Sequence, residues 1–184
     1  MKGFLLFFLI LLVACSPAAA EEIPPPGETV VAFLTHIQLG EYEEAYALAA
    51  GEMLYALKEI EEEYRGIFES LSYGEMTETT EDGYAYVTFT INAVDFTAVM
   101  EGIMAEAFHM VFEDITVSEL TDRVRTMLVD EMTADTAPIL SREITVALEI
   151  YDGQWKIIID EAFVDAITGG FFSFAEYAGQ WMLD

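Results

Sequence analysis

Two stretches of regular alternation between apolar and polar residues constrain the fold of this chain most. One runs from Tyr84 to Ala93 and the other from Glu143 to Tyr151. A period of two is typical of a strand with one buried face, because successive side chains point to opposite sides of a sheet. We therefore predict two long strands, whose inward residues are Ala85, Val87, Phe89 and Ile91 in the first and Ile144, Val146, Leu148 and Ile150 in the second.

Asp-Gly pairs flank both strands. Glu81-Asp82-Gly83 separates a weaker strand, 73–80, from the first strand, and Asp152-Gly153 separates the second from a return strand at 155–160. An Asp-Gly pair between alternating segments is a strong hairpin signal, since both of its residues tolerate positive φ. The sequence thus predicts about four strands arranged in antiparallel hairpins.

The remaining segments have apolar residues at helical spacing. We predict helices over 27–39, 41–48, 52–71, 95–113, 118–132 and 161–167, with Ser118 as the N-cap of the fifth and Gly169-Gly170 ending the sixth. The fold class is therefore α+β, with a helical insertion at 94–135 between strands. The aromatic tail, 171–184, is expected to pack across the core; the alternative is an exposed patch for a partner.

The N-terminus carries an export pattern. Lys2 is followed by an apolar run, Gly3 to Val13, which is roughly 16 Å long as a helix and too short to span a bilayer. Directly after this run, Leu12-Val13-Ala14-Cys15 resembles a bacterial lipobox. The resemblance implies cleavage before Cys15 and attachment of a diacylglycerol, with palmitate-type chains, to its sulfur. The alternative is an ordinary signal peptide with an incidental cysteine.

This pattern divides the chain into three parts. We predict a lipoprotein signal peptide at 1–14, a lipidated cysteine and Pro-rich tether at 15–26, and one domain at 27–184. The three prolines of the tether favour an extended conformation, which would hold the domain up to roughly 30 Å from the membrane. The predicted location is the cell membrane, facing outside the cytoplasm, with the covalent lipid on Cys15 as the membrane contact.

Charge excludes one class of partner. The chain has 34 Asp and Glu against 7 Lys and Arg, a formal net charge of −27. Binding to nucleic acid needs basic surface, so we predict no nucleic-acid partner, and anionic lipid headgroups would repel the domain as well. Lipidation of Cys15, the single cysteine, would leave no thiol for a disulfide or a metal site.

Few residues suggest chemistry. Asp95 and Asp160 end predicted strands and are weak candidates for a catalytic acid or base; the alternative is that each caps a helix. Glu106 and His109 form a Glu-x-x-His pair, the spacing of carboxylate-bridged di-iron bundles, and are weak metal candidates. Such sites need the pair twice and two further glutamates. The other histidine, His36, has Phe33 where the second pair would need a carboxylate, so we predict no metal and no cofactor.

The order of elements resembles a known family. Gly40-Glu41-Tyr42-Glu43-Glu44-Ala45-Tyr46 after an opening helix, and Asp152-Gly153-Gln154-Trp155-Lys156-Ile157 in the last hairpin, are similar to elements of bacterial lipoproteins of unknown function with a nuclear-transport-factor-2-like (cystatin-like) domain. The resemblance implies a curved antiparallel sheet wrapped on N-terminal helices, a cone that often has a pocket. The 94–135 insertion is a departure that could fill or cover the pocket mouth.

Three functions are compatible with these observations. The first is a membrane-anchored, non-enzymatic binding or interaction module whose ligand is a small molecule or an envelope protein. The second, which the family resemblance implies, is a small pocket enzyme of isomerase or cyclase type. The third is an accessory protein for envelope assembly or transport that acts through the aromatic tail.

Overall fold

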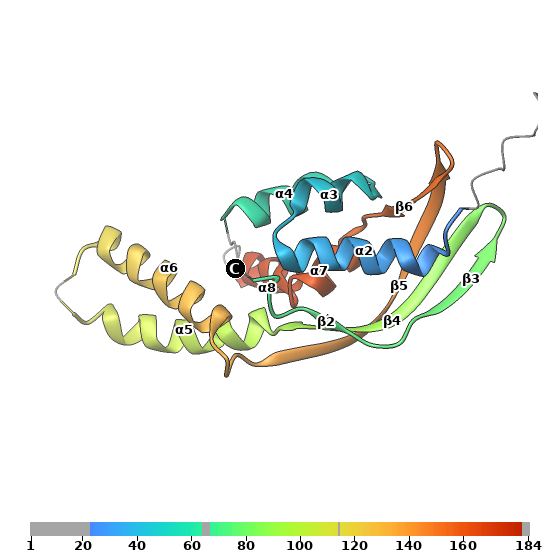
Figure 1. Cartoon of the computed structure of the whole chain (residues 1–184). Coiled ribbons are helices and arrows are strands. Elements are labelled where there is room, and N and C mark those ends of the chain that lie inside the picture. The colour runs from blue at the N-terminus through green and yellow to red at the C-terminus, as the bar shows by residue number, and fades with distance from the viewer. Residues whose placement is uncertain (1–22, 64–66, 114, 182–184) are drawn as a thin grey trace, which may run out of the picture.

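The computed structural model describes residues 23–63, 67–113 and 115–181. Within these ranges the chain forms seven helices and one open, six-stranded sheet (Figure 1). The elements in chain order are α2 (Pro26–Leu39), α3 (Tyr42–Ala47), β1 (Ala49–Ala50), α4 (Leu54–Glu63), β2 (Ser72–Tyr73), β3 (Thr77–Glu81), β4 (Tyr84–Val94), α5 (Phe96–Met110), α6 (Val117–Thr133), β5 (Ile139–Tyr151), β6 (Gln154–Ile158), α7 (Glu161–Ile167) and α8 (Phe171–Trp181). The predicted α+β class is confirmed.

The two predicted long strands form the centre of the sheet. β4 and β5 pair in antiparallel register along the whole of β4, from Tyr84 opposite Glu149 to Val94 opposite Ile139. The residues predicted to face inward on β4 are buried, as are Val146 and Leu148 on β5. Ile144 is half-buried, however, and Ile150, near the end of β5, is 45% exposed, so the prediction was wrong for Ile150. Both Asp-Gly turns are present, with φ of 51° at Asp82 and at Asp152 and positive φ at the glycine that follows each. Positive φ at both central residues is the mark of the hairpin turn that the sequence predicted.

The rest of the sheet differs from the prediction of about four antiparallel strands. The strand expected over 73–80 is broken into β2 and β3, which both pair with β4 and leave residues 74–76 between them. A further strand, β1, has two residues and lies parallel to β6. β1 and β2 have only two residues each, too few to show an alternating pattern. The sequence therefore indicated neither β1 nor the break between β2 and β3.

Helices α2 and α7 lie on the concave side of the sheet and complete the main core (Figure 1). α2 begins with Pro26 at its first turn, where a missing N–H costs nothing, and ends at Gly40 in the left-handed conformation. Phe33 of α2 contacts Phe163 of α7, with ring centroids 5.7 Å apart. The sheet with α2 and α7 is called the body below.

Gly169 and Gly170 end α7 as predicted. Gly169 has φ of +64°, and a Cβ there would overlap the carbonyl of Val94. The main chain of Gly169 approaches β4 so closely that its carbonyl accepts a hydrogen bond from the N–H of Phe96. Glycine is therefore required at this position for space as well as for conformation.

Two predicted helix boundaries were wrong. The helix predicted over 52–71 is α4, Leu54–Glu63, and residues 67–70 form turns. The N-cap of α6 is Thr116 rather than Ser118. The Thr116 hydroxyl accepts from the N–H of Glu119 while the Glu119 carboxylate accepts from the N–H of Thr116, a reciprocal capping box.

Helices α5 and α6 form a hairpin that projects from one end of the sheet (Figure 1). This pair, Phe96–Thr133, is called the arm below. The arm lies at the opposite end of the sheet from the turn that joins β3 to β4 (Figure 1).

The aromatic tail forms α8 and packs on the root of the arm. Phe171 and Phe174 contact the ring of Phe96 edge-on, with centroids 5.0 and 5.5 Å away. Tyr177 is exposed. The expectation that the tail packs on the core is confirmed for its first turn.

Candidate functional site

The strongest predicted site residue, Cys15, lies outside the described residues. So do the predicted signal peptide, 1–14, and the tether as far as residue 22. In the described parts of the chain, no helix is both long and apolar enough to cross a membrane.

Both candidate catalytic carboxylates cap helices. The side chain of Asp95 accepts a hydrogen bond of 3.0 Å from the N–H of Ala98 at the start of α5. Asp160 accepts one of 2.8 Å from the N–H of Phe163 at the start of α7. Each carboxylate therefore satisfies a backbone N–H group that has no partner within its own helix. The alternative role that the sequence left open, helix capping, describes both residues.

The candidate metal residues do not meet other ligands. Glu106 and His109 are both exposed on α5. The other histidine, His36, lies on α2, and its Nδ1 is 2.7 Å from a carboxylate oxygen of Glu41. Among the side chains that the structure describes, no three His, Cys, Asp or Glu residues converge to hold a metal ion.

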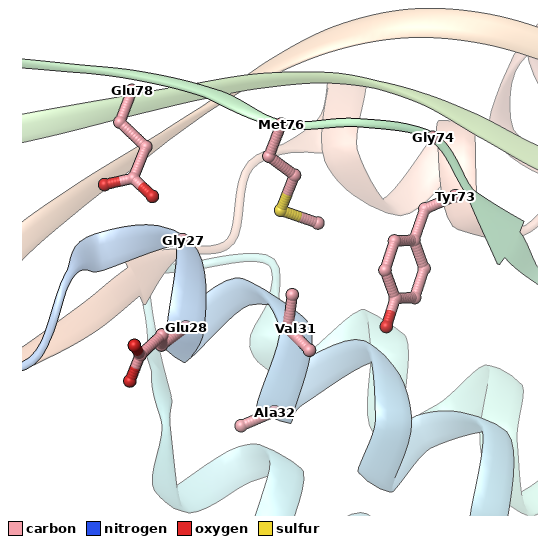
Figure 2. A pocket seen from close by; sticks show the side chains of 8 residues that line it. All are labelled: Gly27, Glu28, Val31, Ala32, Tyr73, Gly74, Met76 and Glu78. Carbon is pink, nitrogen blue, oxygen red and sulfur yellow. The ribbon is translucent and has the colours of Figure 1, made fainter.

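A groove lies between α2 and the edge of the sheet formed by β2 and β3 (Figure 2). Its volume is about 480 Å³ and it is open to solvent. Tyr73 and Met76 point from the strand edge toward α2, and Val31 points back at them. Val31 is 38% exposed although it is apolar. The groove is thus an accessible, largely apolar surface.

The charged groups of the groove, Glu28 and Glu78, lie near the N-terminus of α2. Glu28 lies in the first turn of this helix and is exposed. Glu78 extends from β3 so that a carboxylate oxygen lies against Gly27, where a Cβ would overlap it. Since the helix N-terminus carries partial positive charge, it stabilises this carboxylate. The groove therefore combines apolar walls with carboxylates at one end.

A buried charged cluster joins β5, α7 and α8. Asp165 is 6% exposed, and its carboxylate accepts hydrogen bonds from Arg142 Nη1 at 2.7 Å and from the N–H and hydroxyl of Ser173 at 2.9 and 2.7 Å. Burial raises the pKa of Asp165, but the bonds from Ser173 and Arg142 outweigh it and hold the pKa below its ordinary value. All three hydrogen bonds stabilise the charged form of Asp165. Because two of them come from Ser173 of α8, the cluster holds α8 against α7 and β5.

Sequence reasoning missed these features for different reasons. The groove and the Asp165 cluster are built from segments far apart in the chain, and no local pattern marks them. Met104, Phe108, Val111 and Phe112 are apolar residues within the helix predicted over 95–113. In the structure they form an apolar stripe at the C-terminal end of α5 and in the turn that follows it. These side chains are 59%, 64%, 62% and 77% exposed. A signal was available, because α5 also has a second apolar side, with Val99, Ile103 and Met110, which is the buried one.

Comparisons with known proteins give one structural neighbour to report. No protein-family model matches the chain, and no curated protein matches it. The crystal structure of YcdA from Bacillus subtilis, described as a candidate lipoprotein, aligns with a TM-score of 0.45 and 17% identity. The alignment covers 82% of this chain and 50% of that one, so this chain spans about half the length of YcdA. Similarity at this level establishes neither a shared fold nor a shared function, and the nuclear-transport-factor-2-like cone stays a prediction.

Proposed function

We propose that the protein is a lipid-anchored, extracytoplasmic binding module. The observation that carries this proposal is the position of Leu12-Val13-Ala14-Cys15 directly after an apolar run too short to span a bilayer. Two or three acyl chains hold a protein far more firmly than one, at about 0.8 kcal/mol per buried methylene. The net charge of −27 supports the lipid as the only membrane contact, since the domain itself is repelled by anionic headgroups.

Replacing the cysteine tests the anchor. In the full chain, Cys15→Ala is expected to prevent incorporation of labelled palmitate and to move the protein from the membrane to the soluble fraction, or to leave it as an uncleaved precursor. Ser16→Ala, one residue further on, is the matched control and is expected to leave labelling and fractionation unchanged. Palmitate labelling of Cys15→Ala like that of the wild-type chain would contradict the proposal, and so would fractionation and electrophoretic migration that are both like those of the wild-type chain.

The groove supports a binding role. Val31, Tyr73 and Met76 offer an apolar surface that water reaches, and such surfaces in concave sites favour ligands with an apolar body. The carboxylates of Glu28 and Glu78 and the acidity of the whole chain disfavour anions there. The ligand class that fits is a small, apolar molecule that is neutral or cationic.

A pair of matched probes tests this class. Decyltrimethylammonium is expected to bind more tightly than decyl sulfate in calorimetric titrations below their micelle concentrations. Met76→Ser should weaken binding of the cationic probe, whereas Met104→Ser, the same change on the exposed stripe of α5, should not. Equal effects of the two substitutions would show that the probe binds elsewhere.

The two other functions gain no support from a specific observation. The pocket enzyme would need an available acid or base, and the two candidate carboxylates are engaged as helix caps. The accessory role was expected to use the aromatic tail, but the rings of Phe171 and Phe174 pack against Phe96.

A further inference from the structure

The stripe at the C-terminal end of α5 gathers four exposed apolar side chains, Met104, Phe108, Val111 and Phe112. On a helix with 100° per residue, Met104, Phe108 and Val111 lie within about 60° of arc. Phe112 follows, and its ring packs edge-on against that of Phe108 with centroids 5.4 Å apart. These four side chains are exposed, whereas Val99, Ile103 and Met110, on another side of α5, are buried.

The area of this surface matches what a small dimer interface requires. A large apolar side chain offers roughly 150–250 Å² when fully exposed, so the four residues, each more than half exposed, present roughly 500 Å². Two copies would together bury about 1,000 Å², the lower bound for a specific protein–protein interface. A patch of several hundred Å² on a protein surface is often functional.

Charge and side-chain size indicate which partner binds the stripe. Anionic lipid is disfavoured because the chain carries a net charge of −27. A second copy fits because the surface complements itself: Ala105 and Phe108, both exposed, are one helical turn apart. When two α5 helices pack antiparallel about this point, Phe108 of each lies over Ala105 of the other, a large residue against a small one, twice.

We infer that the protein forms a homodimer in which the α5 helices of two copies pack antiparallel, with the two-fold axis near Ala105 and Phe108. The interface does not depend on the lipid anchor. The only charged residue within the arc of the stripe is Glu101, at the end of α5 nearer the body. Because both copies are strongly acidic, their mutual repulsion falls as salt is added, so dimerisation strengthens with ionic strength.

Site-specific cross-linking of the full chain tests the interface. Cys15 is the only native cysteine, so Ala105→Cys introduces one new thiol, close to its own copy across the predicted axis. Mild oxidation, in membranes and again in detergent extracts, is expected to give a disulfide-linked species of twice the chain mass. Thr126→Cys, at an exposed position on α6, is the matched control; neither it nor the wild-type chain should give this species.

A second substitution separates packing from chance collision. Phe108→Ser, added to Ala105→Cys, should lower the yield of cross-linked dimer at least about fivefold, the effect of losing roughly 1 kcal/mol at an interface. Raising the salt concentration should increase the yield of the Ala105→Cys dimer. The inference is overturned if Ala105→Cys cross-links no more than Thr126→Cys, or if its product has the mass of a complex with a different protein. If the Ala105→Cys chain incorporates no palmitate but still cross-links in detergent extracts, the lipid anchor is refuted and the homodimer is supported.

Discussion

The body and the arm use similar residues in opposite ways. In the body, Phe33 of α2 is fully buried and meets Phe163, 130 residues further along the chain, with ring centroids 5.7 Å apart. In the arm, Phe108 is 64% exposed and its ring meets that of Phe112, four residues away. The body is held together by contacts between distant segments. The arm is a local helical hairpin that leaves several large apolar side chains exposed.

This difference separates folding from association. Burial of apolar area is what stabilises a fold, so a phenylalanine that stays in water contributes little to it. An apolar residue kept in water by one chain is available to stabilise a contact with another. We therefore expect substitutions in the body to change the free energy of unfolding, and substitutions on the arm stripe to change association instead.

The same substitution in both regions gives the largest expected contrast. Phe33→Ala should lower the free energy of unfolding by about 3–5 kcal/mol, because it leaves a cavity in a packed core. Phe108→Ala should change it by about 0.5 kcal/mol or less when the chain is dilute enough to be monomeric. Urea unfolding of both variants measures the difference. Similar losses from the two would mean that the stripe is packed in solution and that the contrast between body and arm is wrong.

Local patterns predicted the parts of the fold that local physics determines. The alternation at Ala85–Ile91 predicted the buried face of β4, and Asp152-Gly153 predicted the turn between β5 and β6, with positive φ at both residues. Asp160 was foreseen as a helix cap, as the alternative to a catalytic role. In each case the information lies within a few neighbouring residues, where spacing and backbone preference decide the structure.

What the sequence did not predict depends on contacts between distant residues. Nothing near Asp165 indicates that Arg142, on β5, and Ser173, on α8, will surround it. The groove needs α2 to lie beside the edge of the sheet at Met76, which only the fold arranges. The exposed stripe has another cause: spacing shows that Phe108 shares a helix face with Met104, but not whether another element covers that face.

The Asp165 cluster gives the next largest effect, again in the body. Asp165→Ala should cost about 1.5–3 kcal/mol, because it removes the carboxylate that accepts hydrogen bonds from Arg142, whose side chain is 38% exposed, and from Ser173. Hydrogen exchange should rise in α8 before it rises in β4. Glu161→Ala, an exposed acidic residue on the same helix, is the control and should cost less than 1 kcal/mol. A cost as small for Asp165→Ala as for the control would show that the cluster does not fasten α8.

The same cluster makes stability depend on pH. The pKa of Asp165 is lower in the folded chain than in the unfolded one, so its contribution is complete above the unfolded value, about 3.9, and is lost as the pH falls through the folded value. Asp165→Asn should remove this part of the acid sensitivity. Urea unfolding at a series of pH values from 6 downward measures how the free energy of unfolding depends on pH. If this dependence is the same for wild type and variant, the acid sensitivity comes from other carboxylates.

The capping box of the arm gives the smallest expected effect. It also tests most directly whether the arm unfolds independently of the body. Thr116 caps α6 through a hydroxyl that accepts from the N–H of Glu119 at 3.3 Å, and the hydrogen bonds that Thr116 donates to the Glu119 carboxylate lower the pKa of Glu119. Thr116→Ala should cost about 1 kcal/mol, the usual value of such a cap. If the arm opens as a local unit, this cost appears as faster hydrogen exchange in the first turns of α6, with exchange in β4 and β5 unchanged. Ser118→Ala, two residues away, should leave exchange as it is, because Ser118 is not the cap. Equal acceleration in α6 and in β4 would mean that arm and body unfold together.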